Sequence, residues 1–266
     1  MGYWLAVKLP ASVQRSCKRR AVLISGTGAS LLITDGKGGE IPIPENVRLY
    51  LFASIQHGGG AVAAKFPFNH YPANPAEYGA VHRALVVALD QRVSAAVPPP
   101  PSHFPRIRDG RFVIASPENY GFPAIPGVIY PGLVNELSVM DYSTQPPRPI
   151  EGREYLIHVP KVDDIAGVRV PDIRVPRGTH TGWNLRRHGF GEGELLLLGS
   201  YFPFAATEQE RVAAGDPRPS LEERYPTRDH YVKAIARAVE ELQNKRLLPA
   251  EDADLIAKAA SERVDK

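Results

Sequence analysis

Proline and glycine set the strongest limit on what this chain can fold into. Its 266 residues include 26 prolines and 23 glycines. Proline fixes φ and lacks a backbone N–H, so it interrupts helices and sheet interiors, whereas glycine favours turns. We therefore expect many turns and long irregular connections. The four consecutive prolines at residues 98–101 mark the boundary that we predict between a first region, residues 1–97, and a second, residues 98–266, packed on it.

The composition is that of a folded, water-soluble chain. Hydrophobic residues make up 43% and charged residues 23%, within the range of ordinary globular proteins. The formal net charge is +3, and the basic residues are scattered apart from the run at residues 18–20. No apolar stretch approaches the roughly 18 residues that suggest a membrane span. We therefore expect neither nucleic-acid nor membrane binding.

No metal or other cofactor is expected. The single cysteine, Cys17, has no partner for an internal disulfide or a cysteine-based metal site. A metal set of His57 and His70 with Asp90 or Glu77 is conceivable, but the chain has no H-E-x-x-H or His-x-His spacing. Neither compartment nor oligomeric state follows from the sequence.

One strand is predicted more clearly than any other, at residues 47–53. The segment VRLYLFA is nearly continuous in apolar character and bounded by proline and glycine, as expected of a strand covered on both faces. It is followed by the sequence SIQHGGG, so His57 stands on a glycine-rich loop at the strand's carboxyl end. Enzymes built on open α/β sheets place ligand-binding groups at this position.

Helices are predicted at residues 76–96 and over most of the last 60 residues. Apolar residues recur every three or four positions in residues 76–96, and the proline run ends that helix. Ser220 and Glu223 form a capping-box pattern, Thr227 is a plausible N-cap, and Pro249 can open a final helix. Shorter strands are expected at residues 111–115, 133–140, 154–159 and 167–170, and residues 193–199 favour a buried strand or helix.

The serine of a hydrolase elbow is missing. The pattern G-x-S-x-G, which exposes the nucleophile of α/β-hydrolases on a strained turn, does not occur in the sequence. We interpret Ser25, Ser30 and Ser200 as turn or cap residues. In these enzymes the triad runs Ser, then Asp or Glu, then His, so a fragment with the last strands would hold the acid and the base. Residues 21–89 fit that part of the fold, and His57 is the candidate base.

Several blocks in one order resemble the C-terminal half of a large bacterial family of α/β-hydrolase domain proteins. The blocks are ASLLITDG at residues 29–36, IPENVRLYLFASIQHG at 43–58, RALVVALD at 83–90, FPAIPGV at 122–128, TGWNLR at 181–186 and GDPRPSLEERY at 215–225. Together they reach from residue 29 to about residue 260. In that family the histidine after the strand resembles the triad base, which corresponds to His57.

The resemblance has two departures. Where the family has an acidic residue followed by aromatics, this chain has SGTG at residues 25–28. Asp35 is the only carboxylate between residues 21 and 40 and is the default substitute acid, although it can instead turn the glycine-rich loop. The first 20 residues resemble nothing in the family, which suggests a chain truncated at its N-terminus.

The resemblance implies a parent activity of ester hydrolysis on a small-molecule ester by a Ser-acid-His triad. Without its nucleophile, this chain is expected to be inactive alone. The alternative is a non-catalytic remnant or pseudoenzyme that binds a ligand or partner. The implied fold is α/β: the last strands and C-terminal helix of the hydrolase sheet, then a proline-rich, mixed α+β extension ending in helices. In a truncated sheet, residues 47–53 would lie at an exposed edge.

Two smaller groups are also candidates. His180, near Trp183 and Asn184, lies in a polar-aromatic loop that can line a pocket or pack around the tryptophan. The charged residues around the capping box, Arg218, Glu222, Glu223 and Arg224, are expected to form surface ion pairs at a helix start.

Overall fold

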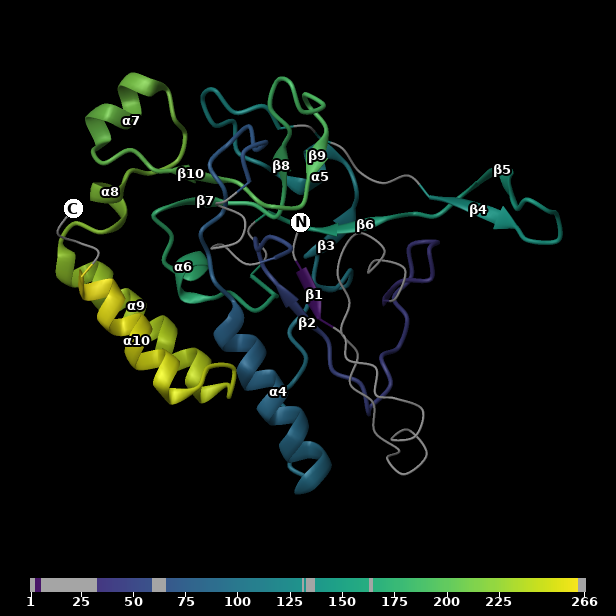
Figure 1. The fold of residues 1–266 in the computed structure, drawn as a ribbon, viewed down its shortest axis with the longest axis horizontal. Coiled ribbons are helices and arrows are strands. Elements are labelled where there is room, and N and C mark those ends of the chain that lie inside the picture. Colours follow the sequence, from purple (N-terminus) through teal and green to yellow (C-terminus); the bar gives the residue numbers. More distant parts are fainter. Residues whose placement is uncertain are drawn as a thin grey trace.

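A computed structural model describes residues 33–58, 66–130, 132, 137–162 and 165–262, and the backbone of residues 3–5. Helices and short strands are joined by turns and irregular segments, as the proline and glycine content predicts (Figure 1). The strands are β1 (Tyr3–Leu5), β2 (Tyr50–Phe52), β3 (Phe112–Ile114), β4 (Ser138–Asp141), β5 (Arg148–Glu154), β6 (His158–Pro160), β7 (Gly178–His180), β8 (Asn184–Leu185), β9 (Leu195–Leu196) and β10 (Tyr201–Pro203). The helices are α4 (Gly79–Ser94), α5 (Pro117–Tyr120), α6 (Pro171–Arg174), α7 (Glu208–Ala214), α8 (Leu221–Arg224), α9 (Arg228–Asn244) and α10 (Ala250–Glu262).

The sheets within the described residues are small and antiparallel. The strands pair two by two, as β1 with β2, β3 with β6, β4 with β5, β7 with β10 and β8 with β9. Among the described residues, parallel pairing is limited to isolated bridges, of Tyr50 with His103 and of Phe52 with Val168. The predicted mixture of helices and strands is confirmed. An extended parallel hydrolase sheet is not observed among the described residues.

Strand β2 is shorter than predicted, and both of its edges are paired. One edge meets β1 in antiparallel register, with Tyr3 opposite Phe52. On the other edge the Leu51 N–H donates to the His103 carbonyl at 2.9 Å, and the Leu51 carbonyl accepts from the Val168 N–H at 2.7 Å. Leu51 and Phe52 are fully buried. The expectation of an exposed edge at residues 47–53 is therefore wrong, because segments distant in sequence cover it.

The largest core cluster joins β2 to helices α4, α9 and α10 (Figure 1). Helix α9 contributes Tyr231, Ile235, Ala238, Val239 and Leu242, which repeat at helical spacing and so share one face. Because the cluster contains residues from both sides of residue 97, the two predicted regions share a core. The domain boundary itself stays a prediction. No helix in the described ranges combines the length and apolar character needed to cross a membrane.

The helical predictions at the C-terminus are confirmed. The capping box of Ser220 and Glu223 is formed at the start of α8, and the Thr227 side chain caps α9. Helix α10 begins at Ala250, directly after Pro249. The predicted helix at residues 76–96 is observed as α4. At residues 193–199, where we predicted a buried strand or helix, the structure has only the two-residue strand β9. Leu197, directly after it, is 48% exposed.

Arg218 is not part of a surface ion pair, contrary to the prediction. The Arg218 side chain is only 8% exposed. Its guanidinium lies 2.6 Å from an Asp216 carboxylate oxygen and also donates to the carbonyls of Phe202 and Pro203. These bonds tie the segment before α8 to strand β10. The Arg218 guanidinium also holds the pKa of Asp216 below its usual value. The surface interpretation does hold for Glu223, which pairs with Arg211 at 2.8 Å.

Replacing Arg218 by Met should destabilise the fold by about 3–5 kcal/mol, because Asp216 would remain buried without its counter-charge. Urea unfolding followed by circular dichroism measures this change. Lys233→Met is the matched control, since Lys233 pairs with Asp229 through side chains that are 66% and 67% exposed, and it should change stability by less than about 1 kcal/mol. Equal effects of the two substitutions would refute a structural role for the Arg218 pair.

Candidate active site

The candidate site is the loop that carries His57 away from β2. His57 is exposed, and its backbone N–H donates to the Leu197 carbonyl at 2.8 Å. Ser54, at the start of the loop, has a φ of 53°, in the left-handed region that non-glycine residues rarely adopt. Such a conformation costs about 1–2 kcal/mol and persists where surrounding contacts fix it. The turn that presents His57 therefore depends on its supporting contacts.

The main support is the side chain of Asn74, which is fully buried. Its Nδ2 donates to the Ser54 carbonyl at 2.8 Å and to the Thr181 carbonyl at 2.9 Å. Its Oδ1 accepts from the Ala76 N–H at 3.0 Å and lies 2.8 Å from Nδ1 of His180. One side chain thus joins the His57 loop, the segment before α4 and the end of β7.

Further buried polar groups surround Asn74. Gln56, beside His57, donates from Nε2 to the Ala76 carbonyl at 2.9 Å. Asn184 donates to the carbonyls of Tyr71 and Gly199. Thr181 accepts from the Ser200 N–H at 2.9 Å. Among the described residues, the buried Oε1 of Gln56 has no hydrogen-bond partner, so the network is satisfied around Asn74 and not at every atom. Hydrogen-bonded networks of this kind rigidify their surroundings, because breaking one bond leaves a desolvated group without a partner.

Ser200 belongs to this network as a structural residue. It is fully buried, and its hydroxyl donates to the Trp183 carbonyl at 2.7 Å. Ser200 therefore joins two distant segments and is not the turn or cap residue that we predicted. Ser25 and Ser30 lie outside the described residues, as do Cys17, the basic run at residues 18–20 and the SGTG segment.

Asp35 lies in its own glycine-rich loop. Its Oδ1 accepts from the backbone N–H groups of Lys37 at 2.7 Å and Gly39 at 2.8 Å. These bonds hold the pKa of the exposed Asp35 carboxyl below its usual value. The loop-turning alternative for Asp35 is confirmed. Burial lowers the pKa of His158, and this outweighs the opposite effects of a hydrogen bond with the Leu156 backbone and of the Asp35 negative charge.

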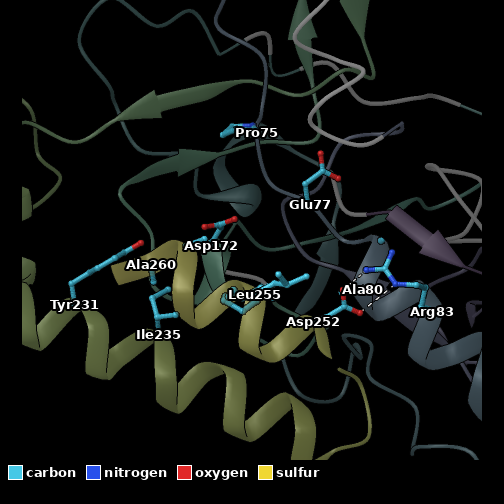
Figure 2. Close-up of a pocket in the computed structure, with 14 residues that line it drawn as sticks. Pro75, Glu77, Ala80, Arg83, Asp172, Tyr231, Ile235, Asp252, Leu255 and Ala260 are labelled. Carbon is cyan, nitrogen blue, oxygen red and sulfur yellow. Dashed lines mark hydrogen bonds and ion pairs between the residues drawn. The ribbon is translucent and has the colours of Figure 1, made fainter. Parts of the chain in front are cut away.

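Both predicted features of the His180 region are present. Trp183 is buried among Tyr71, Phe122, Tyr130 and Phe202, which confirms its packing role. His180 lines a cavity of about 140 Å³, and burial lowers its pKa to about 4, so the ring is neutral at pH 7. A second cavity of about 360 Å³ lies between α4, α6, α9 and α10 (Figure 2). Pro75 and Glu77 lie on one side of it and Leu255 on the other (Figure 2).

The sequence alone did not single out Asn74 or Gln56. An Asn-Pro dipeptide ordinarily signals only a turn, and a glutamine before a histidine carries no pattern of its own. Their importance comes from pairing with residues far along the chain. Across the described ranges, no group of three or more His, Cys, Asp or Glu side chains is arranged to hold a metal ion.

Gly199 shows how tightly the network packs. It has a φ of 69°, and a Cβ at this position would lie 2.6 Å from the Thr181 carbonyl oxygen and 2.8 Å from Cβ of Gln56. Gly193 has a similar φ of 82°, but a Cβ there would meet nothing within 4 Å. Alanine at either position would be forced into a left-handed backbone conformation, which destabilises both variants. Only Gly199→Ala would also place its Cβ too close to neighbouring atoms.

We expect Gly199→Ala to reduce the free energy of unfolding by about 1–3 kcal/mol more than Gly193→Ala does. Chemical unfolding of the two variants beside the unaltered chain gives the difference. If both variants lost the same stability, the packing beneath the His57 loop would be looser than the structure indicates.

The comparison with protein families gives one match. The family model described as "Alpha/beta hydrolase domain" matches residues 44–258. That range includes His57, Asn74 and His180 and begins after Asp35. No curated protein and no solved structure matches the chain. Because the family model covers most of the sequence, this chain belongs to the α/β-hydrolase domain family.

Proposed function

We propose that this hydrolase-family chain serves carboxylic-ester hydrolysis, with His57 as the general base. The observation that carries the proposal is the position of His57, exposed on a loop directly after the buried strand β2. The loop is fixed by Asn74 and by the bond from the His57 N–H to Leu197. A general base needs an accessible ring on a well-held backbone, because proton transfer requires hydrogen-bond reach.

In the proposed reaction the His57 imidazole takes the proton of a serine hydroxyl as the oxygen attacks the ester carbonyl. It then returns the proton to the departing alcohol oxygen. The sequence contains no G-x-S-x-G, so we propose that the serine comes from protein outside this sequence. The substrate is a small-molecule ester whose acyl and alcohol groups meet a pocket shared with that other protein.

Asp35 is the proposed acid that would act on the His57 imidazole, in addition to its observed role in turning its own loop. Both of its loop hydrogen bonds use Oδ1, so Oδ2 is the oxygen that would accept from a ring N–H. In this role the carboxylate would fix the imidazole tautomer and stabilise the imidazolium that forms.

A second candidate is a non-catalytic module that binds a ligand or partner. It is favoured by the missing elbow motif and by the Ser200 hydroxyl, which is buried and bonded to Trp183. The upstream reading frame separates the two candidates. An in-frame G-x-S-x-G favours a divided hydrolase, and its absence favours the binding module.

The rate of p-nitrophenyl acetate hydrolysis tests the role of His57. The chain alone should turn over this ester near the uncatalysed rate, and His57→Ala should change little. In a longer protein that adds an upstream serine elbow, His57→Ala should lower kcat by several orders of magnitude, because triad members act as a unit. His188→Ala is the matched control, since the His188 side chain is 94% exposed, and it should leave the rate unchanged.

Two results would contradict the proposal. An active longer protein that is indifferent to His57→Ala would exclude His57 as the base. Fast, His57-dependent hydrolysis by the chain alone would show that its nucleophile is already present.

A further inference from the structure

His180 is a buried histidine that lines a cavity. It ends strand β7 and is 8% exposed. Its Nδ1 lies 2.8 Å from Oδ1 of Asn74, and its ring lies beside Tyr201, with centroids 4.8 Å apart. The ring also forms part of the wall of the 140 Å³ cavity.

The hydrogen bonds fix the tautomer of His180. Nδ2 of Asn74 donates to two carbonyls, so Oδ1 of Asn74 is an acceptor. Nδ1 of His180 must then carry the proton, and Nε2 presents a lone pair. Nε2 has no hydrogen-bond partner among the described residues, and it is not sealed in the core. Burial keeps the pKa of this ring near 4, so at neutral pH Nε2 accepts and does not donate.

The residues around Nε2 of His180 define which ligand could donate a hydrogen bond to it. Asp172 and Arg177 line the same cavity and bring opposite charges, and Tyr201 and Tyr231 supply ring surface. Pro75, Asp172 and Tyr231 also line the 360 Å³ cavity, so the two spaces adjoin. The larger cavity adds apolar side chains from α9 and α10, among them Ile235 and Leu255 (Figure 2).

We propose that these adjoining cavities bind a small, neutral alcohol or phenol. Its hydroxyl donates a hydrogen bond to Nε2 of His180, and its apolar body lies against Tyr231 and the apolar side chains of α9 and α10. A neutral ligand fits because the two charges beside His180 are opposite in sign. An aromatic ring fits the volume, since an engineered apolar cavity of roughly 150 Å³ admits benzene. This site does not depend on the proposed ester hydrolysis.

Phenol and toluene are the matched probes, because they share a ring and differ in the hydroxyl. NMR titration of the full chain, followed at the ring C–H signals of His180, should show saturable phenol binding. Phenol should bind roughly tenfold more tightly than toluene, as expected for one neutral hydrogen bond. His180→Gln should weaken phenol binding about tenfold, and His188→Gln, at an exposed loop histidine, should leave it unchanged.

The comparison of probes on the unaltered chain keeps the test decisive if His180→Gln fails to fold. The proposal is overturned if neither probe binds or if phenol and toluene bind equally well. It is also overturned if a folded His180→Gln variant binds phenol as the unaltered chain does. Since none of these readouts involves ester turnover, they are independent of the role of His57.

Discussion

The buried amide of Asn74 is the interaction on which the rest of the site depends. Its nitrogen bonds the carbonyls of Ser54 and Thr181, and its oxygen meets the Ala76 N–H and the His180 ring. The partners come from the His57 loop, from the end of β7 and from the segment that carries Asn74 itself. Because an unsatisfied buried polar group costs about 1–3 kcal/mol, the four bonds favour one arrangement of these segments over alternatives.

This arrangement explains how a chain with short sheets can hold a functional loop. The strand before His57 has only three residues, so regular pairing cannot extend to the loop. Side-chain hydrogen bonds take over where the strand ends, and they stabilise the left-handed turn at Ser54. The same amide orients His180 toward its cavity. The His57 loop and the His180 ring are therefore joined through the same buried amide.

The sequence predicted the local features of this fold well. Helices α4, α9 and α10 and the Ser220 capping box follow from periodicity and from short-range bonds that a sequence pattern encodes. It failed where pairing is long-range. One edge of β2 is covered by β1 and the other by residues near 103 and 168, which no local pattern links to residues 50–52. The burial of Arg218 was missed for the same reason, since its partners include carbonyls on β10.

For the candidate site, the sequence identified His57 from its place after an apolar strand and from resemblance to the family. The family match over residues 44–258 confirms the family, and the role of His57 within it stays a proposal. Asn74 could not be predicted, because one asparagine between prolines is typical of an ordinary turn. Its function appears only when residues 54, 181 and 180 are seen to meet around it.

Hydrogen exchange at the His57 amide tests the central role of Asn74 most directly. In the intact chain this N–H is bonded to the Leu197 carbonyl at 2.8 Å. We expect Asn74→Ala to speed its exchange by tenfold or more relative to core amides such as that of Ile235, since losing the bonds releases the Ser54 turn. Asn119→Ala, at an exposed asparagine, should have no such effect. If the His57 amide in Asn74→Ala stayed as protected, relative to Ile235, as in the intact chain, Asn74 would not be what holds the loop.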